Sequence, residues 1–136
     1  MNFGIRKETA HYKGFTGGGA QNTAGTTAYA PIGGTTNYNA NERNRQTLVA
    51  RYCKISNLTI VTGTAQPASG TMVFTLRKNG VDTSMVITIP INAAAGTFAD
   101  TTHSVTFSPG DLISLKSVNN ASGNSAELIA WSFRVI

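Results

Sequence analysis

The side chains that could do chemistry are few and widely spaced along the chain. The two histidines, His11 and His103, are far apart, and neither has a partner at the spacing of metal ligands. His103 lies three residues after Asp100, an arrangement more typical of a hydrogen-bonded pair in a loop than of a general base. Cys53, the single cysteine, lies in an alternating segment, which favours a small buried side chain and excludes a disulfide within the chain.

Two further patterns argue against a cofactor site. The glycines between residues 14 and 19 lack the preceding strand and the following Gly-Lys-Ser/Thr of a phosphate-binding loop. Asp111 follows Pro109-Gly110 without other carboxylates around it, so we expect it to stabilise its own turn rather than bind calcium. The sequence therefore predicts no catalytic residue, no metal and no cofactor, and hence a protein that is not an enzyme.

Composition favours strands over helices. The chain has 136 residues, enough for one domain, and only 12% of them are charged, about half the usual share. Its surface must therefore be covered by Thr, Ser, Asn and Gly, which suit strands and turns. No run of about 20 apolar residues occurs, and residues 1–7 lack the apolar core of a secretory signal. We therefore expect that the protein is neither inserted into a membrane nor exported by the classical route. We expect it to be made in a reducing cytoplasm.

Charge is concentrated in the first part of the chain. Residues 1–54 hold seven basic and two acidic side chains, whereas residues 55–136 hold four of each, so the first part carries the whole net charge of +5. Glycines also interrupt any apolar period there. We interpret residues 1–26 as an extended basic arm that only a partner would order; an unimportant tail is the alternative. The candidate partner-binding residues of the arm are Arg6, Lys7, Tyr12, Lys13 and Phe15.

From residue 46 onward the apolar pattern has a period close to two. The clearest local feature is Asn79-Gly80, which joins two alternating runs at 72–77 and 85–89 and predicts a type I′ hairpin. Only residues 40–49 offer a short candidate helix. About seven or eight short strands separated by turns favour a sandwich or a barrel. The chain ends on an apolar strand, which indicates a central strand or a subunit contact.

Several segments resemble a known module. They are 29–34 (YAPIGG), 71–82 (TMVFTLRKNGVD), 97–105 (TFADTTHSV), 108–114 (SPGDLIS) and 131–133 (WSF). Together they resemble a bacterial and bacteriophage jelly-roll module that is similar to the tumour-necrosis-factor and complement globular-head fold. The resemblance covers residues 27–136 and implies a jelly-roll β-sandwich of about 8–10 antiparallel strands that forms a trimer on phage heads, tail fibres or spore surfaces. A collagen-like stalk is absent, since no Gly-X-Y period occurs.

The resemblance and the basic arm together suggest a capsid decoration, or cement, protein of a phage. Such a protein would be assembled in the host cytoplasm and lie on the capsid exterior as a homotrimer. An arm of 25 residues could span up to about 80 Å. It could add a strand to the major capsid protein while Arg6, Lys7 and Lys13 meet acidic side chains, and three arms would add avidity.

The trimer interface is expected to use apolar side chains from the last strand and from the 48–60 region. The candidates are Leu48, Ile129, Trp131, Phe133 and Val135. Sequence alone leaves open whether these side chains face the sandwich core or a three-fold axis, because a strand offers both of its faces.

Two other functions stay open at this stage. A receptor- or glycan-binding tip of a phage tail or head fibre would use loops 65–70, 92–100 and 119–125, although Phe98 is their only aromatic residue. A nucleic-acid surface would use a stripe of Arg43, Arg45 and Arg51 with Tyr52. The modest charge excess and the lack of a recognisable reading motif make nucleic acid an unlikely partner.

Overall fold

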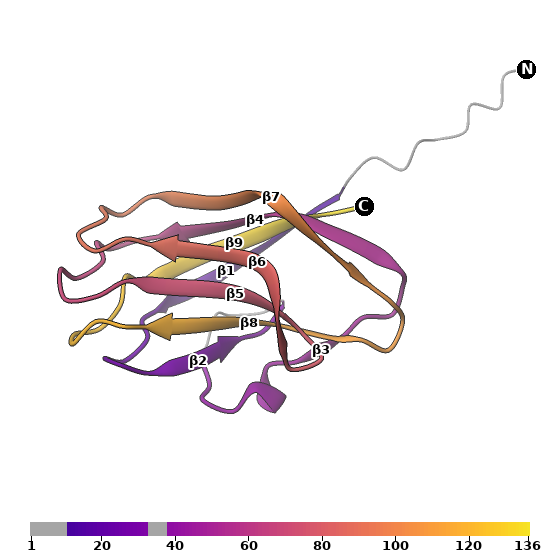
Figure 1. Cartoon of the computed structure of the whole chain (residues 1–136), viewed down its shortest axis with the longest axis horizontal. Coiled ribbons are helices and arrows are strands. Elements are labelled where there is room, and N and C mark those ends of the chain that lie inside the picture. The colour runs from indigo at the N-terminus through magenta and orange to yellow at the C-terminus, as the bar shows by residue number, and fades with distance from the viewer. Residues whose placement is uncertain (1–10, 33–37) are drawn as a thin grey trace, which may run out of the picture.

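The computed structural model describes residues 11–32 and 38–136, and for residues 11–20 it describes the backbone alone. These residues form nine β-strands and one 3-10 helix, arranged as two layers (Figure 1). The elements are β1 (His11–Ala20), β2 (Thr27–Ala30), η1 (Glu42–Asn44), β3 (Thr47–Leu48), β4 (Cys53–Thr62), β5 (Met72–Lys78), β6 (Val81–Ile89), β7 (Thr97–Phe107), β8 (Leu112–Asn119) and β9 (Leu128–Val135). The expected all-β fold is confirmed.

The order of the strands is that of a jelly roll. One sheet has the order β1-β9-β4-β7 and the other β2-β8-β5-β6, with the two-residue strand β3 also pairing with β8. All of these pairs are antiparallel. Apart from β3, only β5 and β6 follow one another within the same sheet, so the chain crosses between the layers at almost every connection.

The two turns predicted most sharply from the sequence are present. Asn79 and Gly80 both have positive φ, 53° and 76°, as a type I′ turn between β5 and β6 requires. In the turn between β7 and β8, Gly110 has φ 95° and the Asp111 carboxylate accepts the Ser108 N–H at 2.8 Å. Asn79 Nδ2 donates to Asp111 Oδ1 at 2.8 Å, so each turn also supports the other.

The apolar faces of the two sheets enclose one core. Its largest fully buried side chains include Trp131, Phe74 and Phe107. β9 lies between β1 and β4, so one of its faces points at the opposite sheet, and Trp131 and Phe133 on that face are only 1% and 3% exposed. Both are core residues of their own chain, which corrects the expectation that they contact a second copy.

The other three candidates for the trimer interface do not form one patch. Leu48 is 64% exposed, whereas Ile129 and Val135 are half-buried near opposite ends of β9. The six residue steps from Ile129 to Val135 span about 20 Å along a strand. The trimer itself stays a prediction of the sequence.

Residues 11–20, expected within the arm, form an edge strand of the sandwich. β1 pairs with β9 from His11 opposite Val135 to Ala20 opposite Leu128. The strand contains Tyr12, Lys13 and Phe15, which are therefore part of the sheet; Arg6 and Lys7 lie outside the described residues. The physical reason is backbone hydrogen bonding: without β1, one side of β9 would present unpaired N–H and C=O groups.

The link between β1 and β2 is also fixed to the sandwich. Asn22 is 3% exposed; its N–H donates to Ser125 Oγ at 2.9 Å, and its Nδ2 donates to Ser117 O at 3.2 Å. Asn119 Nδ2 donates to Asn22 O at 3.1 Å. Gln66 Oε1 accepts the Ala126 N–H at 2.9 Å. We call Asn22, Gln66, Ser117, Asn119 and Ser125 the buried polar network. The sequence placed the boundary between arm and sandwich at residue 26, but contacts with the sandwich already begin in β1.

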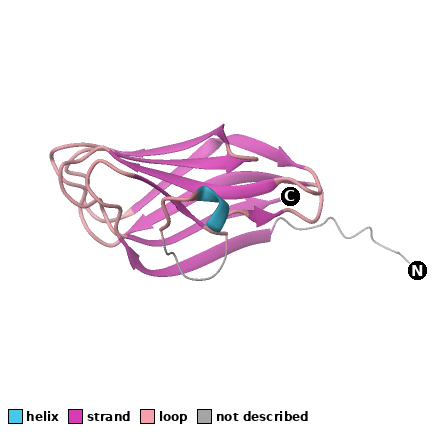
Figure 2. Cartoon of the chain, turned by 90° about the horizontal axis from the view of Figure 1, so that it is seen from below, coloured by secondary structure: helices cyan, strands magenta, loops and turns pink. Residues whose placement is uncertain are grey.

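The two ends of the sandwich differ. The loops 21–26, 63–71, 90–96 and 120–127 gather at the end opposite the C-terminus (Figure 2), and this is the end that the buried polar network closes. β9 begins there at Leu128 and runs to Val135 at the other end, beside His11. The N-terminal ten residues therefore join the sandwich at the end where β9 finishes.

Removing one side chain from the buried polar network should destabilise the fold. Asn119 Nδ2 donates to the carbonyls of Asn22, Thr23 and Gly123. Asn119→Ala leaves these groups without that donor, so we expect a loss of about 1–3 kcal/mol in the free energy of unfolding, measured with urea. Asn120→Ala, at an exposed neighbour, is the control and should cost under about 0.5 kcal/mol. Equal losses would contradict the role of the network.

Candidate functional site

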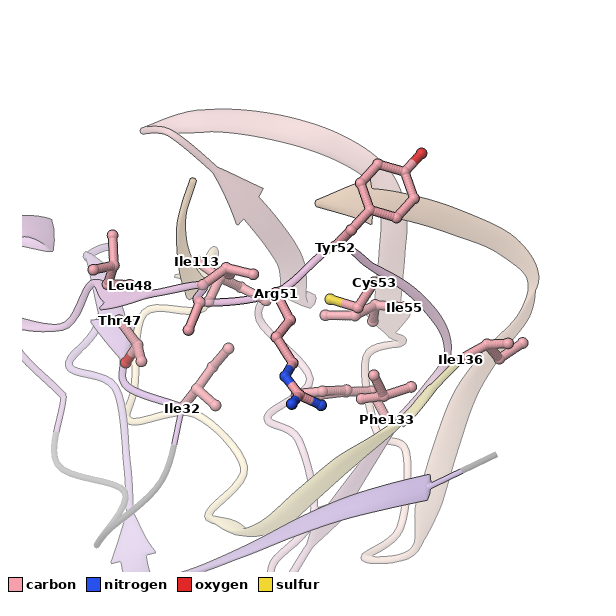
Figure 3. Close-up of a pocket in the computed structure, with 13 residues that line it drawn as sticks. Ile32, Thr47, Leu48, Arg51, Tyr52, Cys53, Ile55, Ile113, Phe133 and Ile136 are labelled. Carbon is pink, nitrogen blue, oxygen red and sulfur yellow. The ribbon is translucent and has the colours of Figure 1, made fainter. Parts of the chain in front are cut away.

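A pocket of about 570 Å³ opens at the end of the sandwich where β9 finishes (Figure 3). Its wall is mostly apolar and combines side chains that are distant in sequence. Among them are Ile32, Leu48, Ile55, Ile113, Phe133 and Ile136. Val135 also lines the pocket and pairs with His11, so β1 begins beside the pocket.

The pocket exists because the chain changes sheets here. Leu48 of β3 pairs with Leu112 of β8, and Val49 exchanges backbone hydrogen bonds with the β7–β8 turn at 2.8 and 2.9 Å. Residues 50–52 then cross to β4 in the opposite sheet. Lys54 and Ile136 exchange backbone hydrogen bonds at 3.0 and 2.9 Å, so Ile136 is held beside the start of β4.

Large apolar side chains are exposed around the mouth of the pocket. Leu48, Tyr52 and Ile136 are 64%, 72% and 57% exposed, and all three line the pocket. In the described part of the chain they are three of the six large apolar side chains that are exposed. Exposed apolar groups gathered in one place are typical of a binding surface.

Arg51 brings a positive charge to this apolar site. Its guanidinium lies over the pocket between Ile32 and Phe133, whereas the Tyr52 ring points away from the pocket (Figure 3). Within residues 11–32 and 38–136, no carboxylate forms an ion pair with Arg51. A guanidinium in such surroundings is suited to bind a carboxylate or phosphate through two parallel hydrogen bonds.

Cys53 lies in the same wall and does not behave as a nucleophile. Its thiol is free and half-buried, and burial raises the pKa of the thiol above its usual value. The reactive thiolate is therefore disfavoured at neutral pH, and the side chain acts as a small apolar group.

The main cluster of charges elsewhere is neutralised within the chain. Arg77 on β5 donates to Glu42 at 2.9 and 3.0 Å and also pairs with Asp82, which Lys116 contacts from β8. The Arg77 guanidinium lowers the pKa of Glu42, whose carboxylate also accepts the Ser114 hydroxyl at 2.8 Å. These contacts attach η1 to the outer face of the sheet and leave no group poised for catalysis.

His103 and Asp100 do form the expected pair, with 2.9 Å between Nδ1 and Oδ2. Asp100 also accepts the backbone N–H groups of Thr102, His103 and Val86 at 3.1–3.2 Å. Burial raises the pKa of Asp100, but the hydrogen bonds from His103 and Thr102 outweigh burial and hold the pKa at about 2. A carboxylate with so many donors joins β7 to β6 rather than serving as a base, and neither residue lines the pocket.

Other candidate sites receive no support from the described residues. Among them, no three His, Cys, Asp or Glu side chains are grouped so as to hold a metal ion. No helix in the same residues is long and apolar enough to cross a membrane. In the loops expected to bind a receptor, Gln66, Asn119 and Ser125 are buried in the polar network and Phe98 packs against the core.

The pocket unites residues that the sequence placed in separate hypotheses. Leu48 and Val135 were candidates for the trimer interface, whereas Arg51 and Tyr52 belonged to the nucleic-acid stripe. Ile136 was not singled out, although a chain that ends on an apolar residue was the available signal. No local pattern marks the rest of the wall, because its residues meet only after folding.

Asp100 should make stability depend on acid pH. Its folded pKa of about 2 lies below the ordinary 3.8, so its contribution is complete above pH 4 and is lost as pH falls toward 2. Asp100→Asn should therefore cost about 2 kcal/mol at pH 7 and much less at pH 2, measured by urea unfolding. His103→Gln keeps the backbone donors and should retain most of the wild-type dependence between pH 4 and 2. A cost of Asp100→Asn that is equal at both pH values would refute this account.

Comparisons with known proteins do not identify a family. No protein family model matches the sequence, and no curated protein is similar to it. Among solved structures, the chain is similar to CBM35 from Cellvibrio japonicus Abf62, with 16% sequence identity and a TM-score of 0.49 over 90% of this chain and 92% of that one. The description of the fold as a jelly roll therefore rests on the strand order itself.

Proposed function

We propose that this chain is a structural protein of a phage particle, a capsid decoration or cement protein without catalytic activity. The observation that carries the proposal is the contrast between the two ends of the sandwich. One end is closed by the buried polar network, whereas the other combines the pocket, the exposed apolar side chains and Arg51. A protein of this form is suited to attach by one end and to present the other outward.

Electrostatics support a partner with acidic groups. Arg51 and the exposed Lys54 are three residues apart at the pocket end, and neither has an ion-pair partner among the described side chains. Arg6 and Lys7 precede β1 in the sequence, and β1 begins at the same end, where His11 pairs with Val135. Complementary charge across an interface accelerates association and fixes orientation. Acidic side chains on the outer surface of a capsid are the counterpart that we propose.

The arm is shorter in this proposal than the sequence suggested. Because β1 starts at His11, the proposed arm is limited to residues 1–10, a length of chain that spans at most about 33 Å. In a homotrimer, three such segments and three pockets would bind together and add avidity. We keep the major capsid protein as the proposed partner and the virion exterior as the proposed location.

A receptor- or glycan-binding tip is the second candidate and is less well supported. It would need free polar groups or aromatic platforms on the loops at the closed end. The polar side chains of Gln66, Asn119 and Ser125 instead bind groups of their own chain. Loops committed to internal hydrogen bonds have fewer donors and acceptors for a ligand.

Binding to phage heads tests the proposal. Heads assembled from the major capsid protein of the phage proposed to carry this chain should co-sediment with it, and intact host cells should not. Removing residues 1–10 leaves β1 in place and takes away Arg6 and Lys7, so we expect weaker binding to heads, by about tenfold, with an unchanged unfolding transition. Binding to host cells in place of heads would favour the fibre-tip alternative.

The oligomeric state is a separate prediction. We expect sedimentation equilibrium at micromolar concentration to give three times the mass of 14.3 kDa. Ile129→Ala, on a half-buried residue of β9, should weaken this association if the last strand contributes to it. A single species with the mass of one chain would refute the trimer.

A further inference from the structure

We infer that the pocket binds an extended acidic segment of a different protein, with one apolar side chain inserted and a neighbouring carboxylate paired with Arg51. The inference rests on the proposed function for one point only, namely that the partner is the capsid subunit. It places the main attachment on the sandwich itself rather than on residues 1–10.

The apolar half of the inference rests on burial. The pocket of about 570 Å³ is deep enough that its walls come from both sheets, with Ile113 on β8 and Ile55 on β4. Its rim carries Leu48, Tyr52 and Ile136, each more than half exposed. An apolar side chain that enters the pocket covers apolar surface of its wall and of Leu48 and Ile136 at its rim and so removes that surface from water.

The charged half rests on Arg51. Arg51 is exposed, and its guanidinium lies over the apolar pocket wall, where it can form charge-assisted hydrogen bonds with an incoming carboxylate (Figure 3). A carboxylate two residues from the inserted side chain would lie on the same face of an extended segment, about 7 Å away along the chain, and could reach the guanidinium. Apolar side chain and carboxylate would thus be recognised together.

The distribution of carboxylates argues against a second copy as the occupant. Of the five acidic side chains in the described residues, four already bind groups of their own chain: Glu42, Asp82, Asp100 and Asp111. The fifth, Glu127, lies at the closed end, beside Gly63. Glu8 belongs to the undescribed residues and follows Arg6 and Lys7 directly, so its segment is net basic. A second copy therefore supplies little that complements Arg51.

Four single variants of the full chain test the inference on heads. Leu48→Asp and Arg51→Met change the pocket, the first by placing a charge at its rim and the second by removing the guanidinium while keeping the apolar stem. Val81→Asp is matched to Leu48→Asp, because both residues are 64% exposed and Val81 does not line the pocket. Arg43→Met is matched to Arg51→Met on an exposed arginine outside the pocket. Unfolding transitions check that all four fold.

We expect Leu48→Asp and Arg51→Met each to weaken co-sedimentation with heads by about tenfold or more, while both controls bind as the wild type does. Equal binding by all four variants, with wild-type binding intact, would overturn the inference and leave the proposed function standing. Failure of the wild-type chain to bind heads would instead overturn the proposed function and the capsid as the source of the segment.

A photo-crosslink identifies the occupant. With benzoylphenylalanine in place of Leu48, irradiation on heads should join this chain to the capsid protein at a segment that contains Asp or Glu. A crosslink between two copies of this chain, or loss of a trimer in Leu48→Asp, would show that the pocket is an interface between copies and overturn the inference. So would single-stranded DNA binding that falls steeply with salt and is lost in Arg51→Met.

Discussion

The pairing of β9 with strands on both of its sides is the constraint on which the rest of the structure depends. β9 holds β1 at one edge and β4 at the other, and its inner face carries Trp131 and Phe133 into the core. The same strand carries the chain from the closed end to the pocket end, where Val135 and Ile136 become part of the binding wall. Core, sheet order and candidate site are therefore set by one eight-residue segment.

The position of β1 changes how attachment is understood. A basic arm of 26 residues would be able to bind a distant neighbour on its own, independently of the sandwich. Since His11 to Ala20 are hydrogen-bonded to β9, the binding groups that remain are concentrated within one end of the molecule. In the proposed function, recognition of the partner therefore depends on the shape and charge of the pocket end.

Features determined by neighbouring residues could be predicted from the sequence, and features that depend on distant residues could not. The Asn79-Gly80 turn and the alternation in β5 and β6 follow from local chemistry, and both predictions are confirmed. β1 has no apolar alternation, because it is held by backbone hydrogen bonds that any sequence can form. Asn22 and Asn119 have the composition of a loop, although they are buried. The pocket combines residues from 32 to 136 and so has no signature in any one window.

The place of β9 in the sheet also has a kinetic consequence. β1 and β4 are separated in the finished sheet by a strand that the ribosome makes more than 100 residues after β1 begins. During synthesis, both strands must wait with open backbone edges, and this sheet can be completed only after residues 128–135 have emerged. Pairing between strands that are far apart in the sequence is slow and leaves aggregation-prone intermediates exposed. Newly made chains should therefore rely on chaperones more than a chain of this length usually does.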